Sequence, residues 1–149
     1  MSFTNDGEGQ ALNRIFTTTT MKQGGITDTT AFVHGTTDFY ISLHESSPGE
    51  TGATTSEVAG PVGSTSYERK VITFTALTAE GNQISNTSPI SWSSIGATWR
   101  SGNNIGHFGI HLGATGEMLC YGSFTGGGAP ATSGDTVTIA AGAIDITLD

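Results

Sequence analysis

Residues 105–124, with the sequence IGHFGIHLGATGEMLCYGSF, contain the clearest β-hairpin pattern in the chain. Residues 113–117 have the length and glycine content of a hairpin turn, so the two flanking apolar runs are predicted to pair. The register that follows places three pairs opposite one another: Leu112 and Met118, Ile110 and Cys120, Phe108 and Gly122. Side chains two apart along a strand share a face. One face is therefore predicted to be apolar throughout, made of Phe108, Ile110, Leu112, Met118, Cys120 and Phe124.

The opposite face of this hairpin is mixed, with His107, Gly109, His111, Leu119, Tyr121 and Ser123. The register sets Phe108 against Gly122 and Tyr121 against Gly109. In each pair an aromatic ring fills the gap that a glycine leaves in a sheet, which supports the register. Since Leu119 and Tyr121 are unusual on a side that faces solvent, we expect a second layer or a second subunit to cover this face.

The composition is that of a β-rich protein with many loops. Among 149 residues there are 22 glycines and four prolines, and only 12% of the residues are charged. This length predicts one domain, large enough to bury a core without covalent staples. Cys120 is the single cysteine, which excludes an intrachain disulfide. The hairpin register predicts that its thiol is buried and structural.

The charge balance argues against two classes of partner. Thirteen acidic residues and five basic ones give a formal net charge of −8. This charge opposes binding to a phosphate backbone and supplies no polybasic patch for a membrane surface. The first residues lack the features of a secretory signal, and no apolar run approaches the ~18 residues of a membrane span. We expect neither nucleic acid nor membrane as a partner, and synthesis in the cytoplasm.

The rest of the chain predicts short strands separated by turns rich in glycine, serine and threonine. Residues 1–10 have the composition of an arm. In residues 11–16 the spacing of Leu12, Ile15 and Phe16 predicts a short helix. Residues 22–37 are predicted to form an extended loop with one short strand. Strands are expected at residues 38–46, 67–77, 83–92, 105–112, 118–124, 136–139 and 143–148.

Two features modify this strand pattern. Pro89 predicts that the strand at residues 83–92 lies at an edge or is bulged. Residues 46–66 form a loop of unusual length with Val58 as its lone apolar anchor, and such loops are often functional. The pattern predicts an all-β fold, an antiparallel β-sandwich of about seven strands with a short N-terminal helix. Residues 1–37 would form the N-terminal arm with helix and loop, and residues 38–149 the sandwich domain.

The sequence carries none of the sharper catalytic motifs, such as G-x-S-x-G, G-x-x-x-x-G-K-[ST], H-E-x-x-H or C-x-x-C. His107 and His111 have a metal-ligand spacing for a helix, but on a strand they lie ~13 Å apart, too far to share one ion. They are instead expected at a subunit contact. We expect no metal, no cofactor and no catalytic residue. The carboxylates Glu45, Glu50, Glu57 and Asp135 are interpreted as solvated loop charges, with a glycosidase pair as the alternative.

The order and spacing of several segments resembles a family of small tailed-bacteriophage virion proteins, described as tail-fibre-like and in some phages found as head decoration or cement proteins. The matching segments are LNRIF, FYISLHES, the loop reaching Glu57 and Val58, YERKVITF, ISNTSPISW, Trp99, IGHFGIHL, GEMLCYGSF and SGDTVTIAAGAIDITLD. The resemblance covers residues 38–149. The chain departs from the family pattern at residues 17–37 and 61–66, which are longer here.

This resemblance implies a non-enzymatic structural protein of the virion. We expect first a capsid decoration protein, a homotrimer that binds the major capsid protein on the outer surface of the head and stabilises contacts between capsomers. The predicted capsid or subunit contacts are Phe3, Leu12, Ile15, Phe16, His107, His111, Leu119 and Tyr121. Alternatively, the apolar side of the predicted helix, made of Leu12, Ile15 and Phe16, packs on one end of the sandwich.

Two further readings stay open. The second is a tail fibre or tail-tip component whose loops contact the host receptor. The third is a carbohydrate-binding or carbohydrate-active sandwich, which would need an exposed tryptophan, Trp92 or Trp99, beside paired carboxylates. We expect Trp92 to lie in the core, because it is in phase with Ile90.

Overall fold

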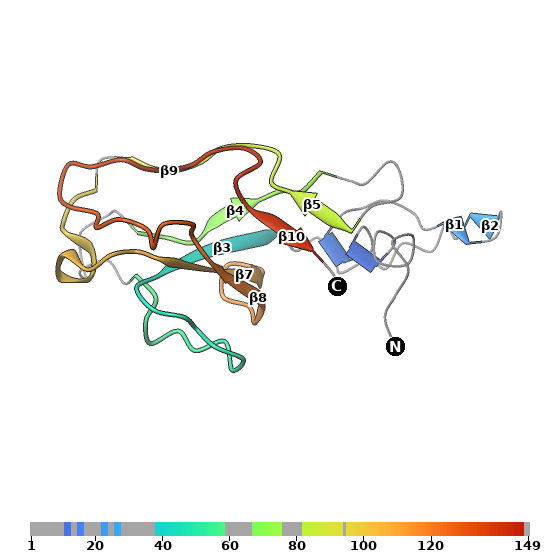
Figure 1. Ribbon diagram of the computed structural model, residues 1–149, viewed down its shortest axis with the longest axis horizontal. Coiled ribbons are helices and arrows are strands. Elements are labelled where there is room, and N and C mark those ends of the chain that lie inside the picture. Colours follow the sequence, from blue (N-terminus) through green and yellow to red (C-terminus); the bar gives the residue numbers. More distant parts are fainter. Residues whose placement is uncertain are drawn as a thin grey trace. The chain divides into compact units, whose positions relative to one another are not determined.

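Two strands with alternating apolar side chains lie at the centre of the largest sheet. β3 (Phe39–His44) and β7 (His107–Leu112) pair antiparallel, with Ile41 opposite Ile110. β4 (Lys70–Ile72) and β8 (Met118–Ser123) flank them, so the strand order is β4-β3-β7-β8 (Figure 1). The fold is all-β and sandwich-like, as predicted.

This computed structural model describes residues 11–12, 15–16, 22–23, 26–27, 38–58, 67–75, 82–93 and 95–147. The chain forms two compact units. Unit 1 contains the described parts of residues 1–37, 72–89 and 139–149, and unit 2 those of residues 38–71 and 90–138. Two stretches expected in the sandwich domain, residues 72–89 and 139–149, thus group with the N-terminal residues.

The β7–β8 hairpin has the predicted turn, and most of its predicted register is confirmed. Phe108 lies opposite Gly122, and Ile110 lies opposite Cys120. The predicted pairing of Leu112 with Met118 is wrong, since Met118 lies opposite His111. Leu119 is the extra residue of a β-bulge, and such a residue reverses the side-chain alternation beyond it.

The bulge moves Met118 from the predicted apolar face to the opposite face. A Cβ atom placed on Gly109 would lie 2.5 Å from Met118 Cε, so the methionine fills the space beside this glycine. The sequence assigned that role to Tyr121. Gly122 is covered as predicted, because a Cβ atom there would lie 2.7 Å from Cζ of Phe108.

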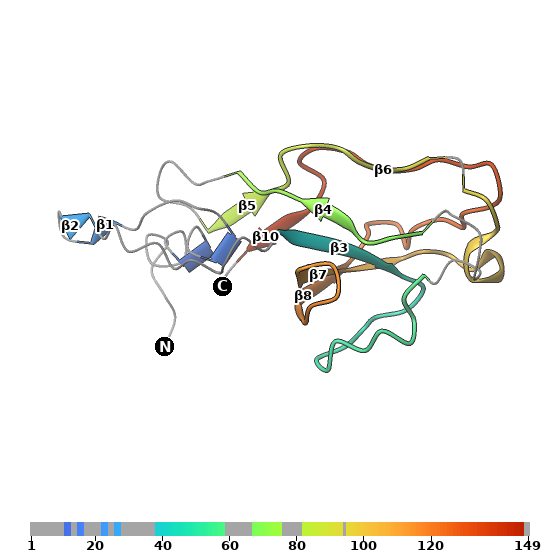
Figure 2. The ribbon, with the colours of Figure 1, turned by 180° about the vertical axis from the view of Figure 1, so that it is seen from behind.

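The core of unit 2 contains both tryptophans. Trp92 belongs to β6 (Ile90–Trp92), which pairs with β9 (Val137–Ile139), and Trp99 begins a 3-10 helix (Trp99–Gly102) (Figure 2). Their ring centroids lie 6.3 Å apart, and Trp92 Nε1 donates to the carbonyl oxygen of Glu68 over 2.8 Å. Trp92 is 2% exposed and Trp99 is 0% exposed. The core position of Trp92 is confirmed, and neither ring is accessible for stacking on a sugar.

In unit 1, β5 (Gln83–Ser85) pairs antiparallel with β10 (Asp145–Thr147). The expected single strand over residues 83–92 is in fact two strands, β5 and β6. The buried Asn86 side chain ends β5: Nδ2 donates to the carbonyl oxygens of Ser88 and Ala140, and Oδ1 accepts from the Ile144 N–H. Pro89 then supplies no N–H for a ladder.

The predicted N-terminal helix is present at the described residues Ala11, Leu12, Ile15 and Phe16. Leu12 and Phe16 are buried, and Phe16 packs edge-on against Phe74 with ring centroids 5.2 Å apart. Further along, β1 (Lys22–Gln23) and β2 (Ile26–Thr27) pair antiparallel, where the sequence predicted one short strand. Within the described residues, no helix is long and apolar enough to cross a membrane.

Candidate functional site

The mixed face of β3 and β7 is partly covered by the segment that follows β3 in the chain. This segment, residues 45–58, is called the covering loop here. Its ends are bonded to the strand and to each other: Val58 N donates to Leu43 O over 2.8 Å, and Glu45 N donates to Ser56 O over 3.0 Å. Val58 is 1% exposed, which confirms it as the anchor of the loop. Part of the cover expected from a second layer or subunit therefore comes from this loop.

A buried cluster of hydroxyl and imidazole groups lies beneath the covering loop. Ser42 and His44 project from β3 and His111 from β7, and none of the three is more than 1% exposed. Ser42 Oγ lies 2.8 Å from His44 Nε2 and 2.7 Å from His111 Nε2. One hydroxyl thus bridges two imidazoles on neighbouring strands.

Both imidazoles make a second contact at their Nδ1 atoms. His44 Nδ1 lies 3.2 Å from Oγ of Ser56 in the covering loop, and that hydroxyl donates to Ser46 O over 3.0 Å. His111 Nδ1 lies 3.1 Å from the carbonyl oxygen of Gly116 in the hairpin turn. The cluster therefore links β3, β7, the covering loop and the hairpin turn.

Two glutamates at the ends of the covering loop form ion pairs. Glu57 pairs with Arg69, and both side chains are about 15% exposed. Burial alone would raise the pKa of Glu57, but the hydrogen bonds and charge of Arg69 outweigh burial and hold that pKa below its usual value. Glu45 accepts hydrogen bonds from Arg100 and Asn103, which lower its pKa to about 2. The interpretation as a solvated loop charge is wrong for Glu57, whose side chain is 14% exposed, whereas Glu45 is ion-paired at the surface.

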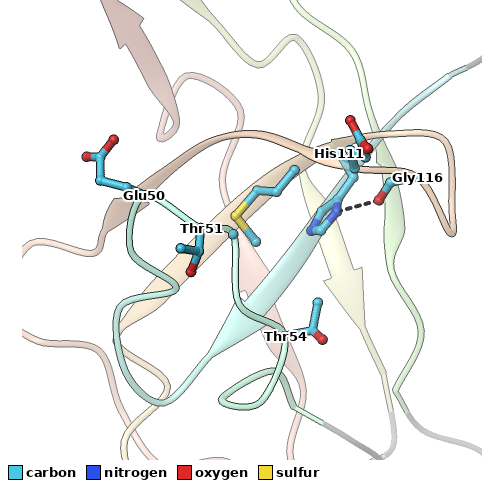
Figure 3. A pocket seen from close by; sticks show the side chains of 8 residues that line it. Glu50, Thr51, Thr54, His111 and Gly116 are labelled. Atoms are coloured by element: carbon cyan, nitrogen blue, oxygen red, sulfur yellow. Dashed lines mark hydrogen bonds between the residues drawn. The ribbon is translucent and has the colours of Figure 1, made fainter.

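A hollow of about 310 Å³ opens between the covering loop and the hairpin turn. Its lining residues are Glu50, Thr51, Gly52, Thr54, His111, Gly116, Glu117 and Met118. Figure 3 shows the His111 ring in the wall of this hollow with its Nδ1 directed at Gly116 O. Among the described residues, no three His, Cys, Asp or Glu side chains gather as metal ligands do.

Residues 25–147 match the family described as podophage GP4 fiber I protein gp80. The chain belongs to this family. The match spans most of both compact units, and it confirms the resemblance to phage virion proteins that the order of segments indicated. Among curated proteins, the sequence finds no significant match.

In this gp80 family member, the predicted contact residues differ in accessibility. Ile15, Leu119 and Tyr121 are 44%, 46% and 39% exposed, and Tyr121 donates to Glu50 over 3.1 Å. Leu12, Phe16 and His111 are buried within the chain, so their side chains serve its own packing. His107 is half-buried, and Phe3 lies outside the described residues. The contact role of the accessible residues stays a prediction.

Sequence reasoning missed Ser42, His44 and Ser56 as members of a buried cluster. In the strand at residues 38–46, Phe39, Ile41 and Leu43 alternate with Tyr40, Ser42 and His44, so the sequence does predict that Ser42 and His44 share the polar face. The covering loop buries that face, and its glycine-rich sequence has no periodicity that predicts where it folds. A signal was present nonetheless, since two histidines and a serine at alternate positions of adjacent strands share one face.

Proposed function

We propose that this protein is a non-enzymatic structural component of a phage fibre. The observation that carries this proposal is the match of residues 25–147 to a family described as fibre proteins. Because the match extends over most of both compact units, the proposal applies to the folded protein as a whole.

The geometry of the buried cluster supports a structural role. A serine near two histidines is a combination that nucleophilic enzymes use, but a nucleophile must reach its substrate. Ser42 and His44 are both 0% exposed under the covering loop. Their hydroxyl and imidazole groups bond to one another and to neighbouring loops, so they hold the fold together.

The part of β8 that carries Leu119 and Tyr121 is the best-supported contact surface. β8 is an edge strand of the four-stranded sheet, and these two side chains are exposed on it. Exposed apolar side chains on an edge strand favour contact with another protein. In a fibre, this surface would contact a neighbouring subunit or another virion protein.

Capsid decoration is the second candidate. In that role a homotrimer would bind the major capsid protein on the head, with Ile15, Leu119 and Tyr121 as its accessible predicted contacts. Its support is the order of segments shared with decoration proteins and the net charge of −8, which suits a surface that does not compete for the genome.

Immunogold electron microscopy of intact virions with antibodies raised against this protein tests the two roles. Label on fibres supports the proposal, whereas label spread evenly over the head would replace it with capsid decoration. A virion that carries Leu119→Ser and Tyr121→Ser tests the contact surface. We expect reduced incorporation of this double variant, and normal incorporation of the control Ser123→Ala, which changes an exposed polar side chain on the same strand.

A further inference from the structure

The contacts of the buried cluster need more protons than its neutral side chains supply. The carbonyl oxygens of Gly116 and Ser46 only accept, so His111 Nδ1 and Ser56 Oγ must donate to them. Ser56 has then used its one proton, and His44 Nδ1 must donate to it. Both Nε2 atoms remain as acceptors, and both face the single proton of Ser42.

One added proton removes this deficit. If one imidazole is charged, its Nε2–H donates to Ser42 Oγ, and the Ser42 hydroxyl donates to the other imidazole. Every contact of 3.2 Å or less between Ser46 O and Gly116 O then has one donor and one acceptor, and the longer contact of Ser42 Oγ with Gly109 O, at 3.4 Å, receives no proton. A second added proton makes both imidazoles donors to Ser42 and places two cations on one buried hydroxyl, which is costly in a low-dielectric site.

We propose that Ser42, His44 and His111 form a proton-operated latch for the covering loop: the bonds of the closed latch accommodate one added proton, and a second added proton releases the loop. The structure favours His111 for the first proton, because Gly116 O accepts from its Nδ1 and the ring lies in the wall of a hollow that Glu50 and Glu117 also line. His44 takes the second proton. Its Nδ1 is bonded to Ser56, so its charging acts directly on the loop.

The charged groups around the latch come from each neighbouring element: His107 and His111 on β7, Glu57 on the covering loop and Arg69 before β4. Burial lowers the pKa of His44 to about 4; Glu57 acts in the opposite direction, and His111, Arg69 and His107 add to the lowering. Burial also lowers the pKa of His111, and the bond to Gly116 opposes this.

The sign of the pH effect follows from these directions. A histidine whose pKa is lower in the closed state than its usual value near 6.5 binds its proton more readily when the loop is open. Closure is therefore fully stable above about pH 6.5 and weakens as the pH falls towards 4. At pH values where His111 is charged in both the open and the closed state, only His44 binds a proton on opening. The equilibrium constant for opening then rises about tenfold for each unit by which the pH falls.

Hydrogen exchange measured by NMR between pH 4 and pH 7 tests this latch in the intact protein. The reporters are the amides of Val58 and Glu45, which hold the covering loop closed. After correction for intrinsic exchange, these two amides report the equilibrium constant for loop opening. Below the pH at which His111 becomes charged, we expect this constant to increase about tenfold for each unit by which the pH falls. The amides of β3 and β7 should keep their protection, because they report unfolding of the sheet.

Two variants separate the latch from its surroundings. In His44→Gln the second proton has no site, so the pH dependence of opening should fall below twofold per unit. His107→Gln is the matched control: His107 faces His44 across the sheet but lies outside the bonded cluster, and the tenfold dependence should remain. If His44→Gln does not fold, the imidazole resonances of the wild-type protein decide. His44 should then titrate at the same midpoint as loop opening.

Two results would overturn the proposal. One is an unchanged pH dependence of loop opening in folded His44→Gln, which would assign the effect to another titrating group. If that group is the Glu57 carboxylate, Glu57→Gln should abolish the pH dependence. The other is titration of His44 near its usual pKa while the Val58 and Glu45 amides stay protected.

Discussion

Arg69 binds Glu57 through both carboxylate oxygens, with Nε 2.9 Å from Oε1 and Nη2 2.8 Å from Oε2. The same guanidinium donates through Nη1 to Ala114 O in the hairpin turn over 3.1 Å, and the phenol of Tyr67 donates to Glu57 over 3.0 Å. One planar side chain therefore joins the covering loop, the segment before β4 and the turn of the hairpin.

Replacing Arg69 by lysine should weaken this junction although the charge is kept. A lysine ammonium cannot reproduce the paired bonds of the guanidinium. We expect Arg69→Lys to lower the free energy of unfolding by about 2 kcal/mol, measured by urea denaturation. The control is Lys70→Ala, whose partner Glu68 is 73% exposed and whose loss should change stability by less than about 0.5 kcal/mol. Equal effects of the two substitutions would contradict the structural role of the paired bonds.

Asn86 should be a sensitive position in unit 1. Its side chain is 2% exposed and makes three hydrogen bonds to backbone groups. Asn86→Ala removes all three bonds and leaves the N–H of the buried Ile144 without its partner, so we expect a loss of about 2 kcal/mol in the free energy of thermal or chemical unfolding. Asn103→Ala, at an exposed asparagine that bonds only to a surface carboxylate, should cost well under half as much. A smaller loss at Asn86 than at Asn103 would show that water replaces the three bonds.

Gly122 should not tolerate a side chain. An alanine Cβ at this position would meet Cζ of Phe108 at 2.7 Å, and the Phe108 ring also packs against Phe124. The ring must then shift, which typically costs about 1–3 kcal/mol. Unfolding of Gly122→Ala should show this loss, and the exposed neighbour Ser123→Ala should stay close to the wild type. Wild-type stability in Gly122→Ala would mean that the ring moves aside without cost.

Cys120 should react slowly with thiol reagents. Burial raises the pKa of its thiol to about 11, so little thiolate exists at pH 8. Labelling with a chromogenic disulfide reagent should be much slower for the native protein than for the urea-unfolded protein. A Ser123→Cys variant in a Cys120→Ala background provides an exposed comparison and should label rapidly. Cys120 is half-buried, and fast labelling of its thiol in the native protein would contradict the raised pKa.

Local sequence patterns predicted the strands and the hairpin turn well. Alternation in FYISLH and HFGIHL assigned the apolar face of β3 and β7, and the predicted register of the hairpin is correct from Ile110 to the end away from the turn. The bulge at Leu119 was not predictable, because no residue type at or beside this position marks where one residue of the strand is left unpaired.

Contacts between distant segments account for the other differences. Ser42 and His44 are buried because the covering loop folds back over them, and that fold depends on Glu57 meeting Arg69 twelve positions along the chain. Asn86 ends β5 through bonds to Ala140 and Ile144, more than fifty positions away. The spacing of apolar residues and the secondary-structure propensities describe residues that are close in sequence. Neither contains information on these long-range contacts.

The number of copies of this chain per purified virion tests the central claim most directly. Quantitative mass spectrometry against isotope-labelled peptides, with the major capsid protein as internal reference, gives that number. A fibre component should be present in a small multiple of the number of fibres. Hundreds of copies in a simple ratio to the capsid protein would contradict the fibre assignment and establish the protein as a decoration of the head.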